Sequence, residues 1–395
     1  MDAPADQPTF TVDGNRLTLL DTGPRRLDAV LALIERAHTS LRMIFYIYAD
    51  DHAGRRVNAA LTAAARRGVK VALIVDGFGA DRADFFRPLE AAGVGVCRFS
   101  PRFGRRYLLR NHQKLALADA ETADARIITG GFNIEDDYFG TPADQAWRDL
   151  GLLLEGPAAA RMAGYFDALE EGIRGGGRVR RLNKALAQWS ERTGRLRWTI
   201  GGPTRRLSPW ARAIKHDMRR ARRIDLIAGY FMPSPMLLRR IERAGVGRGR
   251  RHRAEVRVVT AAKSDNNVTI AAARFTYAGL LRRGVRLFEY QPTKLHTKLY
   301  VVDRATWIGS ANFDMRSLFI NLELMLRIED RAFADHCRAY IDGEVAQSVE
   351  VTRDAYRAAT GWWQRAKQFA AYLLTAVADP AISRGLNFGI DEDDG

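Results

Sequence analysis

Short apolar runs and helical spacings alternate along the chain, and the same order occurs twice. In the first part, buried strands are expected at 15–20, 41–48, 69–76 and 94–99, and helices at 28–37, 54–67 and 85–92. In the second part, strands are expected at 224–231, 256–261 and 285–290, and helices at 235–244 and 266–283. Strands that alternate with helices predict an α/β fold with mixed sheets covered on both faces.

This repeat divides the chain into two halves and three other segments. We expect a flexible arm at 1–13, a first half at 14–173, a basic linker at 174–206, a second half at 207–350 and a helical tail with an acidic end at 351–395. The segment between the last helix and the motif histidine is longer in the first half than in the second. The additional residues predict an insertion around Phe103–Tyr107, which we expect at the rim of the active site. A duplicated unit predicts two pseudo-symmetric halves with the active site at their interface.

A polar motif, H-x-K-x4-D, occurs once in each half. Each copy is followed by a glycine-rich turn that carries an asparagine, and then by a lone acid in an apolar run. The residues are His112, Lys114, Asp119, Asn133 and Asp149 in the first half, and His296, Lys298, Asp303, Asn312 and Glu323 in the second.

The spacing predicts which of these side chains lie together. Side chains alternate between the faces of a strand, so the histidine and lysine at i and i+2 point the same way. The motif aspartates stand at an odd offset. Although Asp119 and Asp303 belong to the catalytic motif, we therefore expect them to orient a turn or accept backbone N–H groups. Turns after glycine can bring Asn133 and Asn312 back beside the histidines.

The residue types suit phosphoryl chemistry without a metal or other cofactor. Lysine supplies positive charge, asparagine supplies neutral donors, and histidine can be a nucleophile or a proton carrier. One histidine can attack phosphorus while the other protonates the leaving oxygen. Asp149 and Glu323 can orient the imidazoles; the alternative is an ion pair with Arg148 or Arg327. Whether each acid serves its own half or the opposite one is open.

The paired motif resembles the phospholipase D superfamily, and within it the bacterial cardiolipin synthases that lack N-terminal membrane helices. The resemblance covers about residues 14–378 and includes the sequences at 66–71, 76–79, 130–134, 147–149, 155–157, 309–317 and 321–323. It implies two phospholipase D-like halves, no metal, and transfer of a phosphatidyl group from phosphatidylglycerol to a second lipid hydroxyl through a phosphohistidine. It also implies that His112 is the nucleophile and His296 the acid, a point on which the sequence itself is symmetric.

The residues are compatible with two other functions, which they support less well. A phosphodiesterase or nuclease of the same fold would use water as acceptor and the basic surface for nucleic acid. No aromatic-rich basic groove that could stack bases is visible in the sequence. A binding protein without catalysis fits poorly because both motif copies are intact.

The composition also indicates which partners the protein binds and where it is located. The 395 residues carry a net charge of +16, which attracts nucleic acid or anionic lipid headgroups. No run reaches the ~20 apolar residues that a spanning helix needs, and the first residues lack the pattern of a signal peptide. Two cysteines form no disulfide framework or metal set. We expect a peripheral protein on the cytoplasmic side of the bacterial inner membrane, bound to anionic phospholipid.

Two segments can be interpreted in two ways each. The tail at 351–378 can pack on the core or lie in one leaflet as an interfacial helix, since it carries Trp362, Trp363, Phe369, Tyr372, Leu373 and Leu374. The linker, with its arginines around Arg180 and Arg181, can be a solvated connection or a basic membrane-facing segment.

Overall fold

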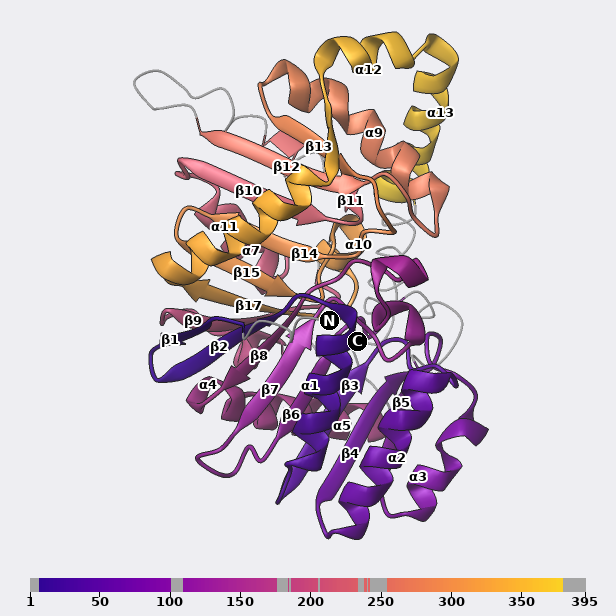
Figure 1. Ribbon diagram of the computed structural model, residues 1–395, viewed down its shortest axis with the longest axis vertical. Helices are drawn as coiled ribbons and strands as arrows, with labels where there is room; N and C mark the ends of the chain where they lie inside the picture. Colours follow the sequence, from indigo (N-terminus) through magenta and orange to yellow (C-terminus); the bar gives the residue numbers. More distant parts are fainter. Residues whose placement is uncertain are drawn as a thin grey trace, which may run out of the picture.

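The computed structural model describes residues 7–100, 109–175, 184, 186–204, 207–233, 238–239, 241 and 254–378, with side chains up to residue 375. The expected insertion at 103–107, Arg180 and Arg181 of the linker, most of the helix expected at 235–244, and the acidic end lie outside these residues. The chain forms two lobes, each built around an eight-stranded sheet (Figure 1).

The first sheet holds the strands of the first half in the order β1-β2-β8-β7-β6-β3-β4-β5. Their bounds are β1 Thr9–Val12, β2 Asn15–Leu20, β3 Ser40–Phe45, β4 Lys70–Asp76, β5 Gly95–Phe99, β6 Leu115–Ala118, β7 Arg126–Gly130 and β8 Gly151–Glu155. Strands β3, β4 and β5 run parallel, and β6, β7, β8 and β2 continue the sheet in antiparallel pairs.

The second sheet has the order β18-β13-β12-β10-β14-β15-β17-β9. Its strands are β9 Leu196–Gly201, β10 Arg223–Ala228, β12 Glu255–Ala261, β13 Arg286–Tyr290, β14 Lys298–Val302, β15 Ala305–Gly309, β17 Glu323–Glu329 and β18 Ser348–Val351. A separate small pair is formed by β11 Phe231–Met232 and β16 Phe313–Asp314. Here β10, β12 and β13 are parallel, and β14, β15, β17 and β9 are antiparallel.

The two sheets therefore repeat one topology, and the mixed α/β fold with two pseudo-symmetric halves is confirmed. Strands β3, β6, β7 and β8 correspond to β10, β14, β15 and β17, and β9 takes the place that β2 takes in the first sheet. Two boundaries expected from the sequence are corrected by this topology. Residues 9–12 of the expected arm form β1, paired with β2, and residues 196–201 of the expected linker form β9, paired with β17.

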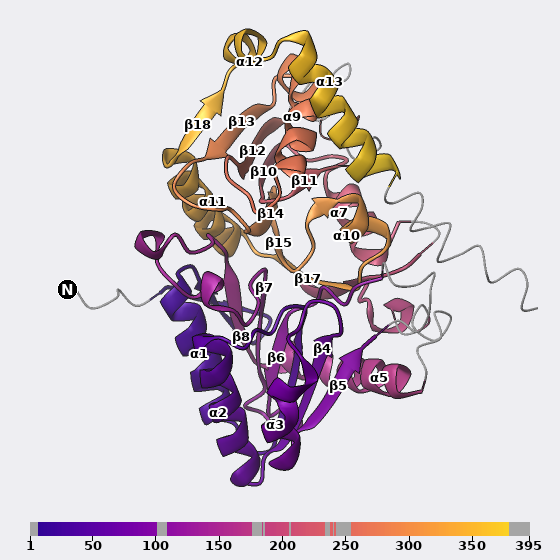
Figure 2. The ribbon, with the colours of Figure 1, turned by 90° about the vertical axis from the view of Figure 1, so that its right-hand side faces the viewer.

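Helices cover the sheets and follow the strands. The α-helices of the first half are α1 Gly23–Glu35, α2 His52–Arg66, α3 Arg87–Ala91, α4 Pro157–Ala160 and α5 Met162–Arg174; those of the second are α7 Pro209–Asp217, α9 Asn267–Arg282, α10 Met315–Phe319 and α11 Arg331–Ala346. Short 3-10 turns are η1 Ala83–Phe86, η2 Asp136–Tyr138 and η3 Pro142–Asp144. Helices α1, α2 and α3 lie on one side of the first sheet and α5 on the other (Figure 2).

The tail folds back along the second half. It contains α12 Arg353–Ala359, α13 Trp362–Tyr372 and the π-helical turn η4 Leu373–Ala378. Tyr372 and Gln368 are buried, and the ring of Phe275 on α9 lies 5.0 Å from that of Tyr372. Among the described residues, no helix is both long and apolar enough to cross a membrane.

The halves meet through two short backbone bridges that follow the same rule. Asn111 pairs with Leu322, and Arg148 pairs with Leu295, both in parallel. In each bridge, the residue before a motif histidine lies beside the residue before the other half's lone acid. Asp76, at the end of β4, supports one bridge by accepting the backbone N–H of Asn111 at 2.7 Å. This arrangement sets the geometry of the site.

Candidate active site

Both motif histidines open into one cleft between the halves. The cleft has a volume of about 500 Å³ and is lined by His112, His296, Asn133 and Asn312 together with residues from both lobes. His112 precedes β6 and His296 precedes β14. The equivalent strands thus present the two imidazoles to the same space.

Each lone acid binds the histidine of the opposite half. Both carboxylate oxygens of Glu323 lie 3.1 Å from His112 Nδ1, and Asp149 Oδ2 lies 2.6 Å from His296 Nδ1. The backbone enforces this exchange, because His112 N–H donates to the carbonyl of Leu322 at 3.0 Å and His296 N–H to that of Arg148 at 2.8 Å. The question that the sequence left open is answered by crossed pairing.

The alternative ion pairs for these acids are wrong. Arg148 binds Glu344, and Arg327 binds Asp217 and Glu329. Both acids are fully buried beside an imidazole instead.

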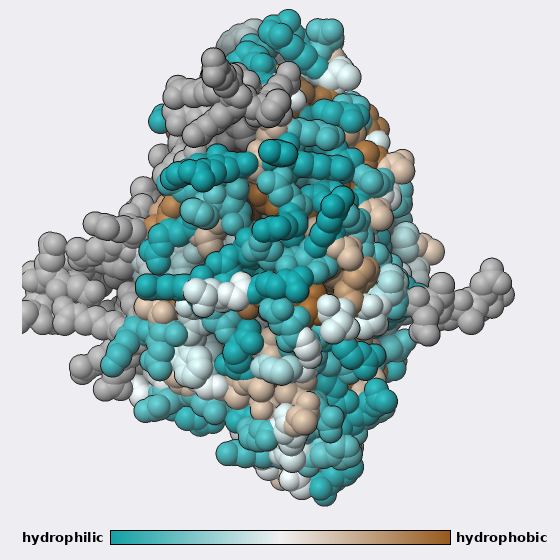
Figure 3. All heavy atoms as spheres, turned by 90° about the vertical axis from the view of Figure 1, so that its left-hand side faces the viewer, coloured by the Kyte–Doolittle hydropathy of each residue, from teal (hydrophilic) through white to brown (hydrophobic). Residues whose placement is uncertain are grey.

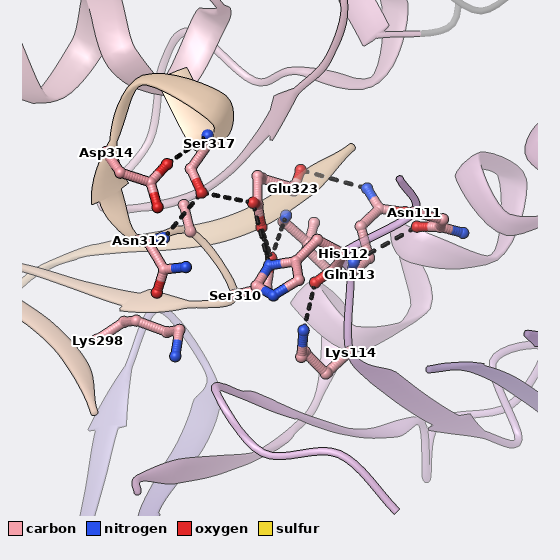
Figure 4. Close-up of polar contacts among 12 residues, drawn as sticks. Asn111, His112, Gln113, Lys114, Lys298, Ser310, Asn312, Asp314, Ser317 and Glu323 are labelled. Atoms are coloured by element: carbon pink, nitrogen blue, oxygen red, sulfur yellow. Dashed lines mark hydrogen bonds and ion pairs between the residues drawn. The ribbon is translucent and has the colours of Figure 1, made fainter. Parts of the chain in front are cut away.

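The two acids are held by different groups. Glu323 accepts Ser310 Oγ at 2.5 Å and Ser317 Oγ at 2.7 Å (Figure 4). In the first half the position of Ser310 is taken by Gly131, where a Cβ would stand 2.3 Å from the carboxylate of Asp149. Asp149 accepts the N–H of Leu150 at 2.7 Å. Sequence reasoning assigned no role to Ser310 and Ser317, although both stand in the matched stretch after the second motif.

The hydrogen bonds of Nδ1 define which atom of each imidazole can react. A carboxylate only accepts hydrogen bonds, so each Nδ1 carries the proton and donates it. Burial raises the pKa of Asp149, but the charges of Lys298 and Arg26 and the hydrogen bond from His296 outweigh it, so its pKa lies below its ordinary value. Nε2 of each ring then keeps a lone pair for attack or for taking up a proton.

Burial and positive neighbours keep both imidazoles neutral when the cleft is empty. Burial lowers the pKa of His112, and Lys114 and Lys298 add to the effect against Glu323. Burial and then the charge of Lys298 lower the pKa of His296 to about 3, although Asp149 opposes them. An anionic phosphodiester between the rings would offset the lysine charges and favour a protonated histidine.

The lysines lie beside the rings and share this burial. Lys114 Nζ donates to the carbonyl of His112 at 2.7 Å; Lys298 Nζ donates to that of His296 at 2.5 Å and stands 2.9 Å from its Nδ1. Burial lowers the pKa of Lys114 to about 7 and that of Lys298 to about 8. Figure 4 shows the side chains of Lys298 and Lys114 near His112, one to each side of it in this view.

The two asparagines that line the cleft differ in how far their side-chain amides are already engaged in hydrogen bonds. Asn133 accepts the N–H of Ile47 at 3.1 Å through Oδ1 and donates to Tyr138 Oη at 3.0 Å through Nδ2. Asn312 Oδ1 is buried and has no hydrogen-bond partner within the described part of the chain. The geometry therefore gives Asn312 more freedom than Asn133 to contact a substrate, and phosphate binding by either one stays a prediction.

The motif aspartates lie outside the cleft, which corrects their inclusion in the catalytic group. Asp119 accepts the backbone N–H groups of His38 and Thr39 at 2.9 and 2.7 Å. Asp303 accepts those of Arg222 and Arg223, both at 2.9 Å. Each carboxylate thus fixes the backbone that leads into the neighbouring strand, β3 or β10, which is the backbone-accepting role that the odd spacing suggested, and each aspartate has positive φ.

Aromatic rings that sequence reasoning did not single out enclose His296. The ring centroids of Tyr138, Trp147 and Tyr230 lie 5.2, 5.1 and 5.9 Å from its own. Among the described residues, the ring of Tyr46 lies 5.2 Å from that of His112. No group of His, Cys, Asp and Glu able to hold a metal occurs among the residues described.

Known sequences place this arrangement in a family. Residues 30–169 and 214–344 match the family described as cardiolipin synthase, phospholipase D-like domain. Cardiolipin synthase B of Escherichia coli K12 is 29% identical over 379 residues, which cover 91% of this chain and 87% of that protein. Cardiolipin synthase A of Pseudomonas entomophila is 30% identical over 358 residues, which cover 87% of this chain and 72% of that protein.

Solved structures agree on the fold. Phosphatidylserine synthase of Haemophilus influenzae superposes with a TM-score of 0.68 at 14% identity, covering 93% of this chain and 95% of that one. Polyphosphate kinase of Porphyromonas gingivalis superposes with a TM-score of 0.58 at 14% identity, covering 90% of this chain and 53% of that one.

The crossed pairing predicts that substitutions of Asp149 and of Asp119 have different effects, the first on kcat and the second on stability. Asp149→Asn removes the charge that orients His296 and should lower kcat by ~10²–10⁴-fold with little change in Tm. Asp119→Ala leaves backbone N–H groups without their acceptor and should lower stability by ~1–3 kcal/mol, while kcat per folded molecule stays the same. Kinetics and thermal unfolding on both variants check this; equal kcat losses would contradict it.

The lysine pKa values predict a pH dependence. Each ammonium is charged below its pKa and can hold the phosphodiester, whereas the neutral amine above it cannot. Because kcat/KM follows the free enzyme, it should fall as pH rises through about 7 and about 8, the values for Lys114 and Lys298. A flat kcat/KM profile on a soluble phosphodiester between pH 7 and 9 would argue against this role.

Proposed function

Because the chain belongs to the family of cardiolipin synthases with phospholipase D-like domains, and is a phospholipid-modifying enzyme, we propose that it transfers a phosphatidyl group from phosphatidylglycerol to the hydroxyl of a second lipid. The observation that carries this proposal is the pair of imidazoles, His296 buried and His112 partly exposed, each held by the other half's acid and each lining the same cleft.

In the first step, His112 Nε2 attacks phosphorus and the bond from phosphorus to the glycerol oxygen breaks. Protonated His296 gives its Nε2 proton to that oxygen, so glycerol leaves as a neutral alcohol. Lys114, Lys298 and Asn312 hold the non-bridging oxygens as charge develops on them. The product is a phosphatidyl group bonded to His112.

In the second step, the hydroxyl of another lipid replaces glycerol. His296, now neutral, takes the hydroxyl proton while the oxygen attacks phosphorus and the bond to His112 breaks. With phosphatidylglycerol as acceptor the product is cardiolipin, and His296 is protonated again. Water in place of the lipid would give phosphatidic acid, the outcome of the phosphodiesterase alternative.

We place the enzyme peripherally on the bacterial inner membrane, on the cytoplasmic side, with the cleft facing anionic lipid. Large apolar side chains are exposed around the cleft mouth and along α13: Phe78, Val268, Trp362, Trp363, Phe369, Leu373 and Leu374. Phe78 itself lines the cleft, and so does Thr375, which follows Leu374. The face turned away from α13 is mainly hydrophilic, with scattered hydrophobic residues (Figure 3).

The tail then combines the two interpretations that the sequence allowed. Tyr372 attaches α13 to α9 from one side, while Trp362 and Trp363 are 68% and 66% exposed on the other. Arg365 and Lys367 are exposed on the same helix and can meet lipid phosphates. A helix of this length with an outward apolar face suits an interfacial position.

The two-step reaction predicts a trapped intermediate. His296→Ala should accumulate phosphatidyl-enzyme on His112 with a leaving group that needs no proton, such as a nitrophenyl ester, and His112→Ala should accumulate none. Both variants should lose phosphatidylglycerol turnover by at least ~10²–10⁴-fold. Mass spectrometry of the intact protein checks the adduct, and lipid mass spectrometry checks for cardiolipin. Near-normal turnover in either variant would rule out the two-histidine scheme.

The exposed tryptophans of α13 predict that their removal weakens binding to vesicles but not catalysis. Replacing Trp362 and Trp363 together by alanine should weaken cosedimentation with phosphatidylglycerol vesicles by at least about tenfold, since each buried aromatic ring contributes about 1.5–3 kcal/mol. Activity on a short-chain soluble phosphatidylglycerol should be unchanged. Val349→Ala on β18, another exposed apolar position, is the matched control. Equal binding by both variants would mean that the membrane contacts another surface.

A further inference from the structure

A carboxylate lies in the cleft wall on the side of His296. Asp265 lines the cleft just before α9, and its Oδ1 accepts the hydroxyl protons of Tyr230 and Ser264, the latter at 2.8 Å. The ring of Tyr230 stands edge-on to His296 at 5.9 Å. Tyr230 therefore connects the acid to the histidine that handles the alcohol proton.

Capping of α9 does not require an acid at this position. The N-terminus of α9 is capped by Asn266, whose side chain accepts the N–H of Val268 at 3.0 Å. Asp265 is exposed and forms no ion pair with another described side chain, and its charge reaches Lys298 only through space. An anionic wall also repels an anionic phospholipid unless its charge binds something on the substrate.

The hydrogen bonds leave one carboxylate oxygen available. Burial, and then the bond to Asp265, raise the pKa of Tyr230 far above its ordinary value. The tyrosine thus stays a neutral donor and fixes Oδ1. Among the described residues, both hydrogen bonds to the carboxylate use Oδ1, so Oδ2 offers its lone pairs to donors on a ligand.

The two ends of the cleft are lined by different side chains, and Asp314 also lines the cleft, within electrostatic reach of Glu323 and Arg316. Arg110 and Arg316 line the wall with Tyr46, the neighbour of His112, and both act electrostatically on Tyr46. Asp265 and Tyr230 line the wall beside His296. The strand registers place Ile47 of the first half where the second has Tyr230, because Ile44 pairs with Leu115 as Ile227 pairs with Leu299. The first half therefore lacks this tyrosine.

We propose that Asp265, oriented by Tyr230, forms the subsite for the alcohol headgroup and selects alcohols that carry further hydrogen-bond donors, either hydroxyls or an ammonium. The proposal rests on the proposed transfer reaction with His112 as nucleophile. In an in-line displacement the leaving oxygen lies opposite the attacking nitrogen, hence beside His296, and the entering alcohol later takes the same place. The remaining hydroxyls of a glycerol headgroup can then donate to Asp265 Oδ2.

Competition between small acceptor alcohols tests this subsite. The full chain is incubated with phosphatidylglycerol vesicles and equal amounts of deuterated glycerol, ethanolamine and 1-propanol, and the phosphatidyl products are measured by mass spectrometry. The wild-type protein should favour a donor-bearing alcohol over 1-propanol. Asp265→Ala should lower that ratio about tenfold, as expected for loss of a hydrogen bond to a charged group, and Asp265→Asn and Tyr230→Phe should lower it less.

The three alcohols show which kind of headgroup binds, and the controls distinguish a failure of the subsite from a failure of the proposed function. A larger loss for glycerol indicates a polyol headgroup, and a larger loss for ethanolamine indicates an ammonium. Asp124→Asn, an exposed acid in the turn between β6 and β7, should leave all ratios unchanged. If Asp265→Ala does not fold, the ratio for Asp265→Asn decides. Unchanged ratios with continued transfer overturn the subsite alone; no phosphatidyl transfer by the wild-type protein overturns the proposed function, and the subsite falls with it.

Discussion

The active site depends on two backbone bridges that join the halves. One links Asn111 to Leu322 and the other links Arg148 to Leu295. Each bridge places a histidine of one half next to the acid of the other, with the hydrogen bond from the histidine N–H to a carbonyl fixing the separation. Neither half alone contains an oriented imidazole. Catalytic competence is therefore coupled to the docking of the lobes, and a displacement at the interface would disturb both histidines together.

Burial gives the cleft its electrostatic character. Two lysines, two histidines and two carboxylates lie close together and away from solvent, where removing water disfavours each charge. The carboxylates hold the imidazoles, and the lysines, with pKa values lowered to about 7 and about 8, retain a charge that an anion would stabilise. A phosphodiester is such an anion. Its arrival would complete the balance of charge and favour the protonated histidine that the leaving alcohol needs.

Pseudo-symmetry makes the differences between the halves informative. Glu323 is held by two serines and contacts His112 with both oxygens, whereas Asp149 sits against Gly131 and makes one short contact with His296. Among the described residues, the rings of Tyr138, Trp147 and Tyr230 pack around His296, and the ring of Tyr46 lies beside His112. A symmetric pair of motifs is thereby given two environments. In the proposed reaction, such a difference would suit one histidine that is bonded to phosphorus between the two steps and one that exchanges protons with successive alcohols.

The sequence by itself determined the alternation of strands and helices, the two halves, the paired motifs and the family, because these follow from local periodicity and from residues close together in the chain. It also placed Asp119 and Asp303 away from the histidines, since strand geometry is local. Only the tertiary structure decided that Glu323 serves His112 and Asp149 serves His296, since 211 and 147 residues separate the partners. The tertiary structure also decided that residues 9–12 form a strand, because they pair with β2 although the sequence around them is polar. It likewise decided the roles of Ser310, Ser317 and Tyr230. Their side chains acquire a role only where long-range packing brings a carboxylate or an imidazole within reach.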